Sequence, residues 1–170
     1  LKPSYLVEQE SRLALDRTTC SVDLQRFRRL VASHEATVEE LDAALRLWSG
    51  TFLEGVESTI EDSGPLYVEW IEEQRNLLAQ QQREARYRLA ETAARTQARL
   101  DLGIAACTHL LHDEPEREEV HRLKMRLLAL DGQRTAALKQ YDECTAALLD
   151  ELGVPPSAET NALYDQIVAG

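Results

Sequence analysis

The sequence contains few residues that break helices. Only seven glycines and five prolines occur among 170 residues, whereas alanine, leucine, glutamate and arginine are abundant. Such a composition is typical of helices joined by short turns. The hydrophobic fraction of 44% is sufficient for a buried core. We therefore expect an all-α fold.

Long apolar runs are also lacking. No run approaches the ~18 residues needed to cross a bilayer, and no basic segment followed by an apolar stretch opens the chain. The three cysteines, Cys20, Cys107 and Cys144, are odd in number and widely spaced, which does not fit a disulfide framework. These features predict a cytoplasmic protein with no membrane partner.

Positive charge is scarce, because 19 Lys and Arg stand against 30 Asp and Glu and leave a formal net charge of −11. Nucleic-acid affinity depends on basic side chains that replace counterions along the phosphate backbone. We therefore expect this chain to bind DNA poorly by itself.

Motifs for catalysis or cofactor binding are missing as well. The sequence has no G-x-S-x-G, no phosphate loop and no G-x-G-x-x-G. His109 and His112 near Cys107 match no common zinc spacing, and Glu118 with His121 forms only one of the two E-x-x-H pairs that a di-iron bundle needs. The sequence therefore predicts no enzyme, no catalytic residue, no cofactor and no metal.

Two further groups of side chains have a binding interpretation and a structural one. Trp48 and Trp70 could stack on a base or an aromatic ligand, but helical spacing favours core packing. A run of arginines could bind phosphate, but interleaved glutamates favour a solvated, salt-bridged face. These arginines are Arg83, Arg86, Arg88, Arg95 and Arg99.

The elements follow from periodicity and capping signals. Residues 5–8 and 12–15 alternate apolar and polar side chains around a polar turn, which predicts a β-hairpin. Thr37 and Glu40 have the spacing of a capping box, and Gly64 with Pro65 restarts the chain after a predicted loop at 52–63. Seven helices are predicted, at about 22–34, 38–49, 66–96, 100–112, 115–130, 133–152 and 158–168. We expect Ala158, Ala162, Leu163 and Ile167 to form the inner face of the last helix.

A repeat of 34 residues links the later helices. The residues that recur with this offset are Gly103, Cys107 and Leu110 with Ala137, Tyr141 and Cys144, and also Tyr87 with His121 and Leu89 with Leu123. This is the period of the tetratricopeptide repeat, in which a small residue lets two antiparallel helices approach closely. Ala44, Trp48 and Thr51 give a weaker third copy. An unrelated helical bundle is the alternative, but stacked repeats would leave a concave surface for a partner.

Longer motifs point to a known family. They include VDLQRF at 22–27, ALRLWSGTFLEG at 44–55, EWIEEQR at 69–75, EP at 114–115, REEVH at 117–121, GQR at 132–134 and ELGV at 151–154. Together they resemble the bacterial transcriptional activator domain (BTAD) of the Streptomyces antibiotic regulatory protein (SARP) family over almost the whole chain. The sequence departs from the family at Ala158, where a proline is common, and at Gly103, where alanine is usual.

The resemblance assigns structural roles rather than a catalytic site. It implies a right-handed tetratricopeptide-like repeat of about seven helices with a short hairpin before it. The signature residues are Phe27, Trp48, Gly50, Phe52, Trp70, Gly103, Cys107, Leu110, Pro115, Ala137, Tyr141, Cys144 and Gly153.

The resemblance also implies a transcription regulator that works through protein contacts. Residues 1–20 would be the terminal hairpin of an upstream winged-helix domain with a linker, and residues 21–170 would be the activator domain. Because the chain opens at Leu1 without a methionine, we expect it to be a fragment, and the resemblance implies that the DNA-contacting residues lie upstream of Leu1. Expected partners are proteins bound by the concave surface, a second copy of the regulator and RNA polymerase. The alternative is a general scaffold that binds a peptide or a partner domain within a multidomain signalling regulator.

Overall fold

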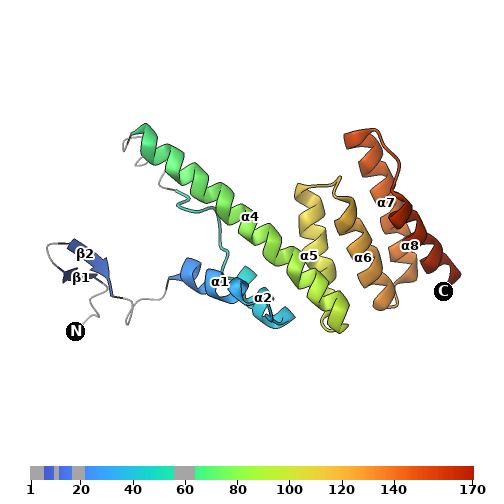
Figure 1. Ribbon diagram of the computed structural model, residues 1–170, viewed down its shortest axis with the longest axis horizontal. Coiled ribbons are helices and arrows are strands. Elements are labelled where there is room, and N and C mark those ends of the chain that lie inside the picture. Colours follow the sequence, from blue (N-terminus) through green and yellow to red (C-terminus); the bar gives the residue numbers. More distant parts are fainter. Residues whose placement is uncertain (1–5, 10–11, 17–21, 56–63) are drawn as a thin grey trace.

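The computed structural model describes residues 6–9, 12–16, 22–55 and 64–170. In this part of the chain it contains seven α-helices and one two-stranded sheet (Figure 1). The strands are β1 (Leu6–Gln9) and β2 (Arg12–Leu15), and the helices are α1 (Asp23–Ala32), α2 (Val38–Leu45), α4 (Pro65–Thr96), α5 (Leu100–Asp113), α6 (Glu118–Leu130), α7 (Arg134–Leu152) and α8 (Ala158–Ala169).

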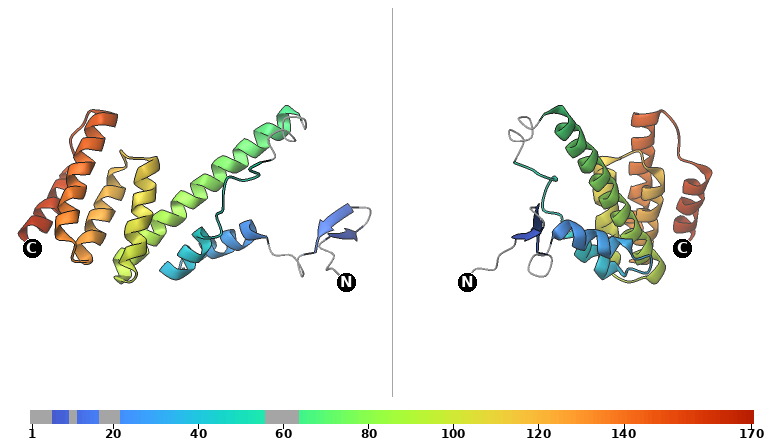
Figure 2. Two further views of the ribbon diagram at one scale, coloured as in Figure 1. Left: turned by 180° about the vertical axis from the view of Figure 1, so that it is seen from behind. Right: turned by 60° about the vertical axis from the view of Figure 1, so that its left-hand side comes forward.

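The predicted hairpin is present, with its first strand at residues 6–9 instead of 5–8. β1 and β2 pair antiparallel, with Leu6 opposite Leu15 and Val7 opposite Ala14. The turn between them lies outside the described residues. The strands stand apart from the stacked helices in each view (Figures 1 and 2).

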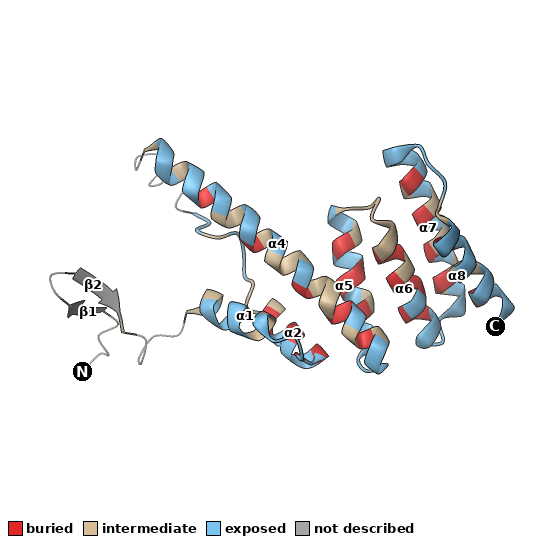
Figure 3. Cartoon of the chain, viewed as in Figure 1, coloured by how far each residue is buried: buried red, intermediate tan, exposed pale blue. Residues whose placement is uncertain are grey.

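The later helices stack side by side as α4, α5, α6 and α7, with α8 against the last pair (Figures 1 and 2). Each pair joined by a short turn, α4 with α5 and α6 with α7, is one helical hairpin of the repeat. Buried residues concentrate in the C-terminal half of α4 and in α5 and α6 (Figure 3). The all-α, tetratricopeptide-like prediction is therefore confirmed.

The long helix α4 runs through 32 residues. It begins where Gly64 has a φ of 95° and Pro65 occupies the first turn, and it ends before Gln97, whose φ is 54°. A 32-residue helix is about 48 Å long, which is long for a domain of this size. Helices α1 and α2 lie against its C-terminal half, while its N-terminal half extends beyond them (Figure 1).

Helix α2 starts as predicted but ends four residues early. The capping box is present, since the Glu40 amide donates to the Thr37 hydroxyl and the Thr37 amide donates to the Glu40 carboxylate. After Leu45 the amides of Leu47 and Trp48 bond three residues back, which tightens the last turn and ends the helix. Trp48 and Thr51 are therefore not on the helix that carries Ala44, and the predicted third copy of the repeat is wrong.

The hairpins approach most closely at Gly103. A Cβ added at this position would lie 2.9 Å from the Cβ of Ala93 and 3.1 Å from a methyl carbon of Leu127. Gly103 is thus in contact with α4 on one side and α6 on the other. The departure from alanine that the sequence shows here has a steric cause, because even one methyl group would push two helices apart.

Helix α8 buries a different face from the predicted one. Thr160 and Ile167 are buried and Leu163 is half-buried, whereas Ala158 and Ala162 are exposed. Polar contacts explain why this face of α8 is turned toward α6. Glu118 on α6 accepts hydrogen bonds from the Ser157 amide at 2.7 Å and from the Thr160 hydroxyl at 2.5 Å.

The same contacts change the acidity of Glu118. Burial alone would raise the pKa of this carboxyl group, but hydrogen bonds from Thr160 and Ser157 and the charge of Arg122 outweigh burial and lower it. The E-x-x-H pair of the sequence therefore does not converge on a metal, since Glu118 holds α8.

His121, the other member of that pair, ties α6 to two neighbours. Its Nδ1 accepts a hydrogen bond from the Gln140 amide at 2.7 Å, so its Nε2 donates to the Pro115 carbonyl at 2.8 Å. The side chain is buried, and burial lowers its pKa below the ordinary value of 6.5. His121 is thus a neutral structural histidine.

We predict that Gly103→Val destabilises the stack. The added branches would clash with Ala93 and Leu127, and overpacking of this kind costs about 1–3 kcal/mol. The free energy of unfolding from urea denaturation measures the effect. Ala105→Val, an exposed position on the same helix, is the matched control and should cost about 0.5 kcal/mol. Equal losses in the two variants would contradict the close approach at Gly103.

We predict that protonation of His121 destabilises the protein in weak acid. Because the folded pKa lies below the unfolded one, the unfolded chain takes up the proton first, and stability falls as pH drops below 6.5. Urea midpoints measured between about pH 7.5 and about pH 5.5 should therefore decline, and His121→Gln should flatten that decline. His109→Gln removes an exposed histidine, and the decline of the urea midpoint with falling pH should be the same in this variant as in the parent. A decline that His121→Gln does not change would refute this assignment.

Candidate interaction surfaces

The described residues contain no cluster of side chains suited to a metal ion. No group of three or more His, Cys, Asp and Glu side chains lies close enough to hold an ion in this part of the chain. Burial raises the pKa of the Cys107 thiol to about 12 and that of Cys144 to about 11. Both thiols are protonated at neutral pH and pack as small apolar groups. Cys20 lies outside the described residues.

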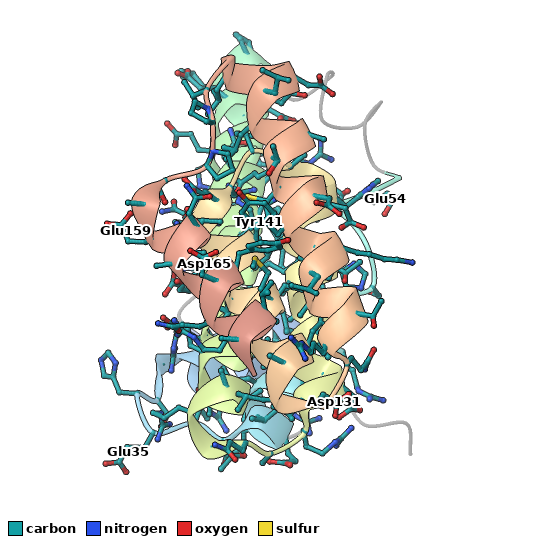
Figure 4. All side chains as sticks on the ribbon, turned by 90° about the vertical axis from the view of Figure 1, so that its right-hand side faces the viewer. Glu35, Glu54, Asp131, Tyr141, Glu159 and Asp165 are labelled. Carbon is teal, nitrogen blue, oxygen red and sulfur yellow. The ribbon has the colours of Figure 1, made fainter. Side chains whose placement is uncertain are left out.

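The signature residues separate into two groups. Gly103, Cys107 and Leu110 on α5, and Ala137 and Cys144 on α7, are buried in the helical stack. Tyr141 on α7 is half-buried, its ring 4.3 Å from that of Tyr164, and its hydroxyl donates to Asn161 at 2.7 Å (Figure 4). The carbonyl of Pro115 accepts the hydrogen bond from the His121 ring. Gly153, with a φ of 68°, caps the C-terminus of α7. These residues take part in packing, hydrogen bonding and capping within the repeat.

Four of the five remaining signature residues line an aromatic pocket between α1, the segment after α2, and α4, and Trp70 is not part of that lining. The pocket measures about 430 Å³. Its lining includes Phe27, Trp48, Gly50, Phe52 and Leu78. The rings of Phe27 and Trp48 meet edge to face with centroids 5.9 Å apart. This arrangement brings together four signature residues that the sequence placed in separate motifs.

The backbone after α2 is fixed by an arginine of α4. Arg75 donates to the carbonyl of Phe52 at 3.0 Å and to that of Leu53 at 3.3 Å. Leu53 has a φ of 55°, a left-handed conformation that is uncommon for a leucine. The segment from Trp48 to Leu53 is therefore held as a defined wall of the pocket.

Trp70 is not the core residue that the sequence predicted. It is 44% exposed, and its ring stacks on Tyr67 with centroids 5.7 Å apart and meets Phe52 edge-on at 6.2 Å. Leu66, one turn away, is 81% exposed. The helical spacing of these apolar residues is real, but their face of α4 lies on the half that extends beyond α1 and α2 (Figure 1).

A second hollow, which we call the basic groove, runs between α4 and α6. It measures about 550 Å³. Its lining residues come from α4, α6 and the turn after α1: His34, Tyr87, Arg88, Glu91, Thr92, Ala94, Arg95, Glu119, Arg122, Leu123 and Arg126. Four arginines therefore line this groove against two glutamates. Sequence reasoning missed it because its two walls are about 30 residues apart in the chain.

The arginines predicted to form one solvated face have different roles. Arg83 pairs with Glu114 at 3.5 Å and Arg99 with Asp101 at 3.0 Å, as expected of salt-bridged side chains. Burial lowers the pKa of Arg86, which lies near Asp113. Arg88 departs from the prediction, because it donates to the carbonyls of Val31 and Ser33 at 2.5 Å each and so fixes the end of α1.

Over the whole chain acidic residues outnumber basic ones, with 30 Asp and Glu against 19 Lys and Arg. Glu35, Glu54, Asp131, Glu159 and Asp165 are all exposed, and Figure 4 shows the first four toward the edges of the molecule and Asp165 on α8. The basic groove is thus an exception on a chain whose formal net charge is −11.

Comparisons with known proteins fit this architecture. The structure of Mycobacterium tuberculosis EmbR in complex with a low affinity phosphopeptide superimposes with a TM-score of 0.62 at 24% sequence identity. The match covers 97% of this chain and 43% of the EmbR chain, and at this identity it shows the fold alone. No curated protein sequence matches. Among the described residues, no helix is long and apolar enough to cross a membrane.

The family comparison covers the helical part of the chain. The family described as bacterial transcriptional activator domain matches residues 22–168, which extend from the start of α1 almost to the end of α8. The resemblance carried by the sequence motifs is thereby confirmed, and the chain belongs to the bacterial transcriptional activator domain family.

Proposed function

We propose that this chain is the regulatory, partner-binding module of a bacterial transcriptional activator and is not an enzyme. The observation that carries the proposal is the open basic groove along the stacked helices, in a chain whose family is shown over residues 22–168. Cys107 and Cys144 are buried in the core, and both ring nitrogens of His121 form hydrogen bonds within the protein. What the stack leaves accessible is a surface suited to another macromolecule.

In this proposal another domain of the same cytoplasmic regulator reads DNA. Residues 1–20 would be the terminal hairpin and linker of a winged-helix domain, and residues 21–170 the activator module. The net charge of −11 supports this division, because an acidic module would be repelled by a phosphate backbone. The chain also spans less than half of EmbR, the protein whose fold it shares.

The module would act by bringing proteins together. Two regulators that bind adjacent promoter repeats gain avidity when their modules touch, and RNA polymerase is a further partner that an activator would contact. The alternative function is a scaffold that holds a peptide within a signalling regulator. The phosphopeptide complex of EmbR and the size of the basic groove favour that alternative as a second candidate.

The proposal predicts a difference between single and tandem promoter repeats. In the full-length regulator, deletion of residues 22–170 should leave affinity for a single repeat unchanged, because the DNA-reading domain is intact. Affinity for two adjacent repeats should fall about 100-fold, since the contact between neighbours is lost. Fluorescence anisotropy with labelled duplexes measures both affinities, and transcription from the tandem promoter in vitro should fall with the second.

Controls separate the two candidate functions. The 170-residue chain alone should show no promoter binding at about 0.15 M salt, because its net negative charge gives it no general attraction to the phosphate backbone. If deletion of the module changes neither tandem binding nor transcription, the activator role is refuted. Peptide capture without any self-association would favour the scaffold instead.

A further inference from the structure

We propose that the basic groove binds an acidic, extended peptide segment of a partner protein through Arg95 and Arg126. This inference rests on the proposed function, since it names the chemistry of the partner. The groove is open, is about 550 Å³ in size and falls within the range of ordinary ligand sites.

The charge of the groove opposes the charge of the chain. Four arginines line it, and one of the two opposing carboxylates is already neutralised, because Glu119 accepts a hydrogen bond from Arg117 at 2.8 Å. That pairing lowers the pKa of Glu119 although burial would raise it, so the carboxylate stays ionised and paired. The remaining carboxylate, Glu91, faces an excess of guanidinium groups. An anionic ligand would therefore be attracted to this hollow and repelled by the acidic surface around it.

Two of the four arginines are fixed in place by the protein itself. Arg88 donates to the backbone at the end of α1, and Arg122 donates to the Thr160 hydroxyl at 3.0 Å and lies 3.5 Å from Glu118. They make the walls rigid and contribute positive charge. Their hydrogen bonds are largely used for holding α1 and α8.

The other two arginines are available to a ligand. Arg95 and Arg126 are exposed, and with the described residues neither forms a hydrogen bond or an ion pair. They lie on opposite walls, Arg95 on α4 and Arg126 on α6. A carboxylate between such walls can accept charge-assisted hydrogen bonds from planar guanidinium groups, which match it better than an ammonium group does.

The spacing of the arginines suits an extended chain. Arg88 and Arg95 are seven residues apart on α4, which corresponds to about 10.5 Å along the helix axis. An extended peptide covers that distance in about three residues. Leu123 on α6 is buried, with 6% of its surface exposed, and adds a small apolar area to the lining. The groove therefore fits a segment with carboxylates about three residues apart, one bound by Arg95 and Arg126 and the next facing the positive charge of Arg88.

A peptide fits these observations better than a DNA duplex. A duplex carries a charge every 1.7 Å or so of its axis and would extend past the groove over the acidic exterior. Glu35 is exposed in the turn next to His34, which lines the groove. A short segment can enter the hollow without facing that exterior.

The test uses a fluorescent ten-residue peptide with glutamate at every third position and serine between. Anisotropy titration with the 170-residue chain should show binding that weakens with added salt, and the peptide with glutamine in place of glutamate should not bind. Arg95→Gln with Arg126→Gln should weaken binding about tenfold or more. Both side chains are exposed and unpaired, so these changes should leave the fold intact, which circular dichroism and urea denaturation can check.

The matched control is Arg29→Gln with Lys139→Gln. Both residues are exposed and outside the lining of the groove, and the control removes the same two charges as the groove variant. It should leave peptide affinity unchanged. The proposal is overturned if the parent chain does not bind the acidic peptide, if the groove variant binds as well as the parent, or if the two variants lose affinity equally. Binding of a DNA duplex that only the groove variant loses, without peptide binding, would overturn it too.

The peptide-binding experiment and the deletion experiment can fail independently, so the groove assignment and the activator role are tested separately. If deletion of the module abolishes tandem-repeat binding but the acidic peptide does not bind, the activator role stands and the groove assignment falls. If the peptide binds and only the groove variant loses it, while deletion has no effect on promoter activity, the groove assignment stands and the activator role falls.

Discussion

The contact around Gly103 sets the spacing of the whole stack. At this point α5 has no side chain, and a Cβ would lie within 3.2 Å of atoms from both α4 and α6. Ala90 and Ala93 on α4 and Ala106 on α5 are buried in the same core. Small residues on facing helices let the backbones approach closely. Apolar surface is then buried by the close packing of the helices and not by large side chains. Because α4 and α6 both pack on α5, their separation, and hence the width of the basic groove, depends on this contact.

Polar ties then fix how successive hairpins are oriented. His121 joins α6 to the turn before it and to α7, and Glu118 joins α6 to the start of α8. Buried hydrogen-bonding groups are costly when left unpaired, so these contacts favour one arrangement of the helices over others with similar apolar burial. The Glu118 and His121 spacing, which in a di-iron bundle would serve a metal, here serves packing. One helix carries both ties to its neighbours.

The features that local chemistry decides could be predicted from the sequence. The length of α4 follows from the absence of glycine and proline after Pro65, and the start of α2 follows from Thr37 and Glu40. The 34-residue offset pairs Gly103 with Ala137, and both are buried where helices approach closely. In these cases the residues that determine the feature lie within one or two helical turns, or repeat with a fixed period.

The features that were predicted wrongly depend on distant neighbours. Periodicity shows that Trp70 lies on an apolar face of α4, but not that α1 and α2 pack against the other half of the helix. For α8, apolar spacing favoured Ala158 and Ala162, whereas contacts between Glu118 and Thr160 decide which face is buried. A helix of 12 residues with a weak apolar stripe is oriented by such contacts rather than by its own pattern.

Net charge is misleading for the same reason. A value of −11 describes the average over the chain, and it is the basis of our expectation that the chain has little general affinity for nucleic acid. A partner meets a local field instead, which the fold creates when it places Arg95 from α4 beside Arg126 from α6. Since fields between exposed charges fade over about 8–10 Å at physiological salt, the acidic exterior does not cancel the groove at contact distance. The sign of a binding surface is therefore a property of the stacked repeat, and it becomes visible only once the helices are placed.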